Sequence, residues 1–217
     1  MALTIVQPGV GGTGVGTFPS PGTAGNVLTS NGTVWTSAAA SGSPLVFLNT
    51  TLVSSAVSAV TFTGLDNSTY ISFMLEYENL RSDVGGQAVC LQLGTNSGLQ
   101  SNYSGSVITN NNSSTSLAFS NSTSDSYLRI TTSDTRADSL GGVNGIAWIS
   151  NINSTSAPAV RAHSNYFNSN NGNSYNSLAS GNAPTSYSVT QVSIRFVPAV
   201  TINISSGRVT IYGLKAS

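Results

Sequence analysis

Charged residues are scarce in this chain. They make up 6% of its 217 residues, whereas a typical soluble domain carries about 25%. The formal net charge is zero, and the seven basic residues are scattered along the sequence. Because binding to phosphates needs a surplus of Lys and Arg on one face, we expect no nucleic-acid partner. Near-zero charge leaves little repulsion between copies, which favours self-association.

Cysteine and histidine occur once each. A lone Cys90 excludes an intrachain disulfide and a thiolate metal cluster, and its apolar neighbours Val89 and Leu91 indicate a small buried side chain. A lone His163 cannot build a multi-histidine metal site, and we interpret it as an inert strand residue rather than the base of a nucleophilic serine. We expect no metal, no cofactor and no catalytic residue, because catalysis at neutral pH mostly needs groups that exchange protons, and this chain has very few of them.

Helix formers and long apolar runs are scarce as well. Glu, Lys and Gln are few, and no stretch approaches the roughly 18 apolar residues that span a membrane. The segment Met1–Pro8 has neither the positive region nor the apolar run of a secretory signal. We therefore expect synthesis in a cytoplasm without a secretion signal, and no insertion into a membrane.

Serine, threonine and asparagine are abundant instead of charged residues, and together they make up roughly two-fifths of the chain. Short apolar runs alternate with polar residues, most clearly in Tyr70–Asn79 and Gln191–Phe196, and a period of two is typical of half-buried strands. The other candidate strands are Leu45–Val53, Val57–Leu65, Gln87–Leu93, Tyr103–Thr109, Ser126–Thr131, Asn144–Ile152, Val160–Phe167 and Arg208–Leu214. They predict an all-β fold over residues 45–217, an antiparallel β-sandwich of the jelly-roll kind.

Residues 1–44 differ from the rest, because they are rich in Gly and Pro and carry no charge. So much Gly and Pro breaks regular structure into turns. The segment nevertheless contains apolar residues that a free linker would not need, namely Val27, Leu28, Val34 and Trp35. We expect an extended arm that becomes ordered by docking on a partner or on other copies.

Two uncharged Asn/Ser-rich runs, 109–116 and 165–176, suggest loops. Tyrosine combined with Ser, Asn and Gly is typical of adaptable recognition surfaces, and the same mixture suits sugar rings and hydroxyls. The candidate receptor-contact residues are Tyr166, Asn168, Asn171, Asn173 and Tyr175. The alternative is that the tyrosines cover sheet edges or subunit contacts.

Three patterns resemble sites but lack their context. The run Gly9–Gly14 has dinucleotide-fingerprint spacing, but neither a helix nor an acidic residue follows it as the fingerprint requires. Glu76 and Glu78 share one strand face, a spacing that would suit glycoside cleavage, although a solvated strand face explains them more simply. Asp134 and Asp138 are too few for a calcium loop.

The arm carries the elements Gly11-Gly12-Thr13-Gly14 and Gly25-Asn26-Val27-Leu28-Thr29-Ser30-Asn31-Gly32-Thr33-Val34-Trp35. Together they resemble a segment of many bacteriophage fibre proteins, in which it precedes a distal β-domain. The ends of the sandwich region, Phe62–Leu65 with Tyr70–Phe73 and Ser206–Lys215, are also similar to that domain.

This resemblance implies a virion structural protein, usually a homotrimer, whose N-terminal arm attaches to tail, baseplate or capsid proteins. Its C-terminal domain would then contact the host surface, often a glycan. The chain has no shaft of repeats, so we expect a short fibre. The alternatives are a capsid decoration or head-fibre protein without a receptor, and a glycan depolymerase that uses Glu76 and Glu78.

Overall fold

The structure is a computed structural model that describes residues 26–30, 35–39, 44–111, 117–132, 135–138, 141–153, 155–197 and 202–216. The chain separates into two compact units, Met1–Ser43 and Pro44–Ser217. The described residues form strands, turns and connecting segments without any helix, so none of them belongs to a helix long and apolar enough to cross a membrane. The all-β class predicted from the sequence is confirmed.

In the first unit the described residues form one antiparallel hairpin, made of β1 (Asn26–Ser30) and β2 (Trp35–Ala39). Of the four apolar arm residues, Val27 is exposed in β1, and Leu28 and Trp35 belong to the two strands. Val34 lies outside the described residues. The sequence did not predict this hairpin, because the surrounding Gly and Pro pointed only to turns.

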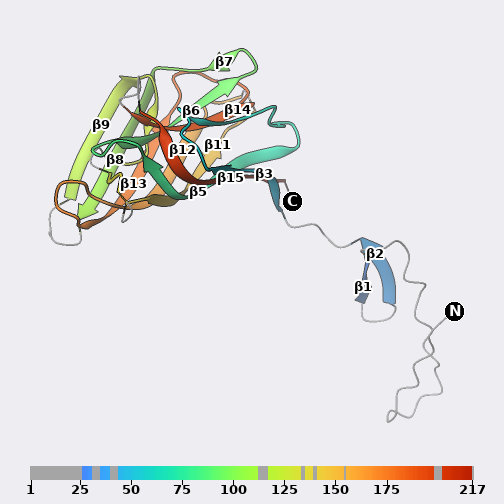
Figure 1. The fold of residues 1–217 in the computed structure, drawn as a ribbon. Coiled ribbons are helices and arrows are strands. Elements are labelled where there is room, and N and C mark those ends of the chain that lie inside the picture. Colours follow the sequence, from blue (N-terminus) through green and yellow to red (C-terminus); the bar gives the residue numbers. More distant parts are fainter. Residues whose placement is uncertain are drawn as a thin grey trace, which may run out of the picture. The chain divides into compact units, whose positions relative to one another are not determined.

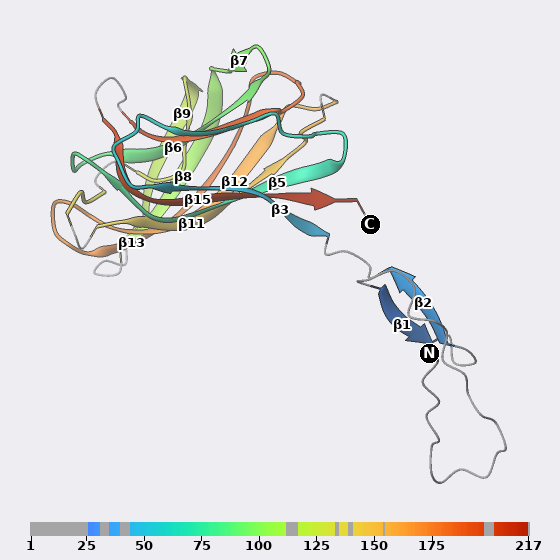
Figure 2. The same cartoon turned by 45° about the vertical axis from the view of Figure 1, so that its right-hand side comes forward.

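The second unit is an antiparallel β-sandwich, as predicted (Figures 1 and 2). Its larger sheet has eight strands, in the spatial order β3 (Leu45–Val53), β15 (Ile204–Lys215), β5 (Tyr70–Ser82), β11 (Val143–Ser150), β12 (Ala159–Phe167), β13 (Ser174–Asn182), β8 (Tyr103–Asn111) and β9 (Leu117–Asp125). The smaller sheet has five, in the order β10 (Leu128–Arg129), β6 (Ala88–Thr95), β14 (Gln191–Val197) and β4 (Val60–Thr63), with β7 (Gly98–Leu99) also paired to β6.

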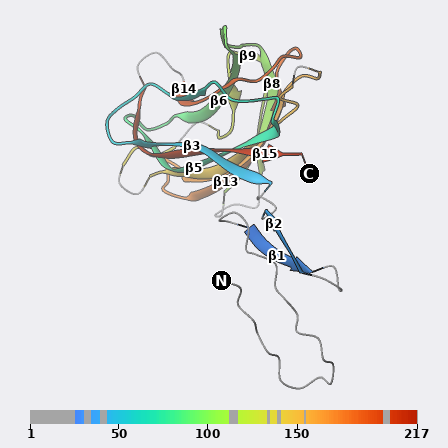
Figure 3. The same ribbon diagram turned by 90° about the vertical axis from the view of Figure 1, so that its right-hand side faces the viewer.

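The core lies between the two sheets, where β6 and β14 cover strands of the larger sheet (Figure 3). In β5 the alternation predicted from the sequence holds for Phe73, Leu75 and Tyr77, which are fully buried, but not for Ile71, which is 54% exposed. Strand β14 contributes Val192, Ile194 and Phe196 to the same core, although Ser193, expected to face outward, is buried as well. Burial of each large apolar side chain contributes about 1.5–3 kcal/mol, so the period of two explains why these segments form strands.

A small polar cluster is buried inside this core. The Tyr77 hydroxyl lies 2.6 Å from Ser164 Oγ, and Ser177 Oγ donates to the Ile130 carbonyl at 3.0 Å. Burial raises the pKa of the Tyr77 hydroxyl, which therefore stays protonated and can donate. Because Ile130 also donates its N–H to the Val89 carbonyl of β6, the segment after β10 links the two sheets.

The strand boundaries agree with the sequence where alternation is regular, and differ where polar residues dominate. Strand β3 has the predicted bounds, whereas β9 and β13 were not predicted. The run 165–176 is not a loop throughout: its two ends belong to β12 and β13, and only 168–173 form the turn between them. In β13 the buried positions hold small residues, Ser177 and Ala179, and in β9 the apolar residues Leu117 and Phe119 are exposed, so neither strand shows a buried apolar alternation in its sequence.

Gly145 in β11 leaves no room for a side chain. A Cβ atom there would lie 2.5 Å from the Tyr77 hydroxyl and would also contact the His163 carbonyl oxygen. We expect Gly145→Ala to lower the free energy of unfolding by about 1–3 kcal/mol, measured by urea denaturation, because the core must shift. The matched control is Gly85→Ala, where the nearest atom is 3.6 Å away. An equal loss in both variants would contradict the packing explanation.

Candidate functional site

The outward-facing side of the larger sheet carries side chains in rows across neighbouring strands. We call it the outer face, meaning the side turned away from the smaller sheet. The strand register aligns one row of mainly apolar residues, the central row: Ile146, His163, Leu178, Ile108 and Phe119. Ile146, Leu178 and Phe119 are 40%, 58% and 66% exposed, which is unusual for large apolar side chains gathered on one face.

Two further rows flank the central row. On one side, the register aligns Trp148, Arg161, Ser180, Ser106 and Asn121, which we call the indole row. On the other side it aligns Asn144, Asn165, Asn176 and Asn110, the asparagine row. Adjacent strands are about 4.8 Å apart, so each row presents its groups at that spacing. The outer face therefore combines apolar, amide and hydroxyl groups in a regular array.

A groove of about 600 Å³ runs along this array over β11, β12, β13 and β8. The backbone of Gly145, Ala162 and Ala179 contributes to its floor, because the small side chains of the two alanines point into the core. The indole of Trp148 and the side chain of Leu178 rise beside it. Its volume falls within the range of sites that bind small molecules, about 300–1,000 Å³.

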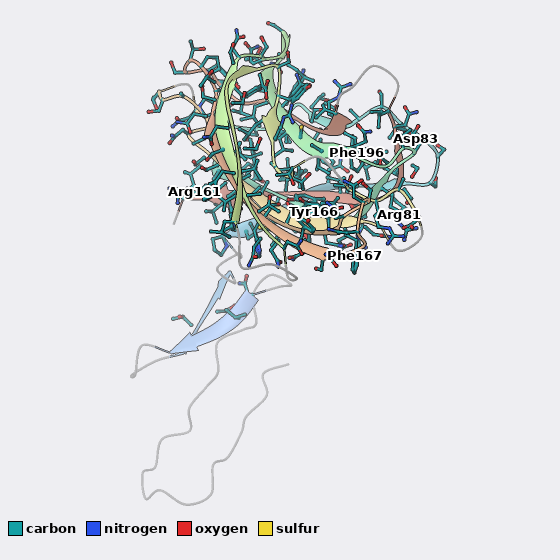
Figure 4. The ribbon with its side chains drawn as sticks, turned by 90° about the vertical axis from the view of Figure 1, so that its left-hand side faces the viewer. Arg81, Asp83, Arg161, Tyr166, Phe167 and Phe196 are labelled. Carbon is teal, nitrogen blue, oxygen red and sulfur yellow. The ribbon has the colours of Figure 1, made fainter. Side chains whose placement is uncertain are left out.

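Arg161 brings a positive charge to the groove. Its side chain is exposed on β12, at the periphery of the sandwich in Figure 4, whereas Tyr166 and Phe196 lie between the sheets. Among the described residues, ion pairs join Arg129 to Asp125, Arg136 to Asp138 and Arg208 to Glu78. Arg161 has no such partner among them, and no Asp or Glu lines the groove.

The five candidate receptor-contact residues come together at the β12–β13 turn, but they are not equally accessible. Tyr166 is 2% exposed and Asn168 is 4% exposed. The Tyr166 ring stacks on Tyr175 with centroids 5.7 Å apart, and its hydroxyl lies 2.6 Å from Thr132 Oγ1. Burial therefore removes Tyr166 from the predicted contact surface, because it faces the core rather than the solvent.

Asn168 is also removed from that surface, since it organises the turn itself. Its side-chain oxygen accepts hydrogen bonds from the N–H groups of Asn170 and Asn171, at 2.7 and 3.3 Å. Such local bonding explains why asparagine is frequent in turns. Asn171 is exposed, while Asn173 and Tyr175 are half-buried, so a direct contact by these three stays a prediction.

The two glutamates of the depolymerase alternative lie on the outer face of β5. Glu78 pairs with Arg208, whose Nε donates to the carboxylate at 2.7 Å. Glu76 accepts a hydrogen bond from the Tyr212 hydroxyl at 3.1 Å, and desolvation, together with this carboxylate, raises the pKa of Tyr212. Both carboxylates thus have partners within the protein, and neither lines the groove.

The remaining candidate residues have structural roles or lie outside the described segments. Cys90 is fully buried, as predicted, and burial raises the pKa of its thiol, which disfavours the reactive thiolate. No cluster of three His, Cys, Asp or Glu residues able to hold a metal occurs within the described segments. Asp134 and the run Gly9–Gly14 lie outside those segments.

Sequence reasoning missed Trp148 and Arg161, and it gave His163 no binding role. The signal was present in the alternation of β12. If Val160 and Ala162 face the core, then Arg161 and His163 must point outward together. In β11, the outward residues Ile146 and Trp148 alternate with the buried residues Ala147 and Ile149. Apolar residues on both faces of this strand indicate that one apolar face is exposed.

Comparisons with known proteins give no relative for this chain. No protein-family model matches it, and no curated protein or solved structure does so either.

Proposed function

We propose that this chain is a short bacteriophage fibre protein, a homotrimer attached to the virion by its N-terminal arm, that contacts a host surface glycan through its β-sandwich. The observation that supports this most is the groove on the outer face. Along it lie the Trp148 indole, the guanidinium of its register neighbour Arg161, and the hydrogen-bonding side chains of Ser180 and Asn165, all on paired strands. The arm motifs that resemble phage fibre segments supply the virion context.

The chemistry of the groove suits a saccharide. The C–H face of a sugar ring is apolar and packs on an aromatic ring, whereas sugar hydroxyls need hydrogen-bond donors and acceptors. Trp148 and Leu178 offer the first kind of surface, and the side chains of Ser106, Ser180 and Asn165 offer the second. Because these groups stand on paired strands rather than on loops, their spacing is held in place before the ligand binds.

A homotrimer is supported by the exposed edge of the larger sheet. Strand β3 is an edge strand without any charged residue, and Phe47 and Leu52 on it are 58% and 73% exposed. An open, neutral and apolar edge invites pairing with another chain. Since β3 begins at Leu45, directly after the arm, copies joined by their arms would bring these edges within reach of one another.

Competition with the virus for host cells tests the proposed function. Purified full-length protein, added to cells before the virus that encodes it, should reduce adsorption in a dose-dependent manner, because both use the same receptor. A variant with residues 169–172 scrambled should compete equally well if the groove makes the contact, and should fail if the turn makes it. A capsid decoration protein would not compete at any concentration, and that result would refute host attachment.

A further inference from the structure

Arg161 is an exposed cation inside a groove that supplies no counter-ion. The chain has seven basic and seven acidic residues, so charged groups are few. The described ion pairs join three other arginines to acidic partners, and no acidic side chain lines the groove around Arg161. The position of this guanidinium therefore favours a ligand that brings a negative charge.

Two acidic side chains, Glu76 and Asp125, have partners of their own and do not neutralise Arg161. Glu76 on β5 is the register partner of Ile146, which in turn pairs with His163. Glu76 therefore lies two strands away from Arg161, in the row of His163 rather than in that of Arg161. Its carboxylate already accepts the Tyr212 hydroxyl. Asp125, at the end of β9, pairs with Arg129. No hydrogen bond or ion pair to the Arg161 side chain occurs within the described segments, so its guanidinium can donate to a ligand.

The neighbours of Arg161 define what kind of anion fits. Trp148 stands directly beside it in the register on β11, and Ser180 stands on the opposite side on β13. A guanidinium binds a planar carboxylate through two parallel hydrogen bonds. The adjacent indole can hold the ring that carries this carboxylate, and the serine hydroxyl can bond a ring hydroxyl. Leu178, which lines the same groove, adds an apolar surface for the C–H groups of the sugar.

We propose that the groove binds an acidic saccharide, one that contains a hexuronic or sialic acid, and that Arg161 pairs with its carboxylate. This inference rests on the proposed function and names the glycan class that the same site selects. His163, two residues along the same strand face and about 7 Å away, contributes a further donor toward the next sugar unit. In this arrangement Arg161 binds the carboxylate, and the side chains of Ser180, Ser106 and Asn165 bind the sugar hydroxyls.

The test compares acidic oligosaccharides with their carboxyl-reduced counterparts. Full-length protein is titrated calorimetrically with a panel of hexuronic- and sialic-acid oligosaccharides, and each is paired with the same sugar after reduction of its carboxylate to an alcohol. At least one acidic member should bind about tenfold or more tightly than its reduced form. Added salt should weaken binding of the acidic form but not of the reduced form.

Arg161→Gln should bring the two affinities together, and Arg161→Lys should keep part of the preference. The control is Arg208→Gln, which removes a cation elsewhere on the outer face and should leave the preference unchanged. Unchanged circular dichroism and melting temperatures show that the variants are folded. Equal binding of acidic and reduced sugars, or a preference that survives Arg161→Gln, would overturn this inference while glycan binding itself stands. Binding of no panel sugar, together with failure to compete for host cells, would refute the proposed function as well.

Discussion

Replacing Trp148 with alanine should weaken saccharide binding by about 10- to 100-fold. The indole is 44% exposed at the side of the groove, so a ligand can cover its free face. Covering a large apolar side chain is worth about 1.5–3 kcal/mol, and 1.4 kcal/mol corresponds to a factor of ten in affinity. Isothermal titration with the tightest-binding oligosaccharide measures the loss directly.

The same substitution should leave the sandwich folded. Trp148 points outward, and the neighbouring core residues Ala147 and Ile149 remain in place on the buried face of β11. Phe119→Ala is a suitable control, because Phe119 is 66% exposed on the same outer face but does not line the groove. It should bind sugar as the unmodified protein does. If Trp148→Ala also binds normally, the groove is not the glycan site.

Much of the fold could be predicted because alternation is a local property. In the middle of β5, burial follows the place of each apolar residue in the strand, so Phe73 and Leu75 could be assigned from the sequence. The same rule, extended from Val160, would have placed Tyr166 inside the core. The Asn/Ser-rich composition of 165–176 instead favours a recognition loop, which places Tyr166 on the predicted contact surface.

The groove could not be predicted, because it depends on which strands lie side by side. It combines β11, β12 and β13, which follow one another along the chain, with β8, which lies far earlier in the sequence. The pairing of Leu178 with Ile108 and of Ser180 with Ser106 is a long-range feature that no local pattern encodes. The division into sheets of eight and five strands has the same origin.

The roles of the arm and the sandwich can be separated by removing residues 1–43. The sandwich should still fold and bind sugar, because Pro44–Ser217 is a compact unit with its own core and β3 begins only at Leu45. If the arm joins the copies and attaches them to the virion, as proposed, the truncated protein should be monomeric and absent from virus particles. Circular dichroism melts, light scattering after size-exclusion chromatography, and immunoblots of purified particles measure these three properties.

Trp148→Ala in the full-length chain provides the converse control. It should remain trimeric and enter particles normally but bind sugar poorly. The truncated chain should lose assembly and keep sugar binding, whereas Trp148→Ala should keep assembly and lose sugar binding. If the truncated chain does not fold, the arm is a structural part of the sandwich and our domain division is wrong. If it folds and still enters particles as a trimer, the sandwich itself carries assembly, and the apolar edge with Phe47 and Leu52 becomes the first place to look for the subunit contact.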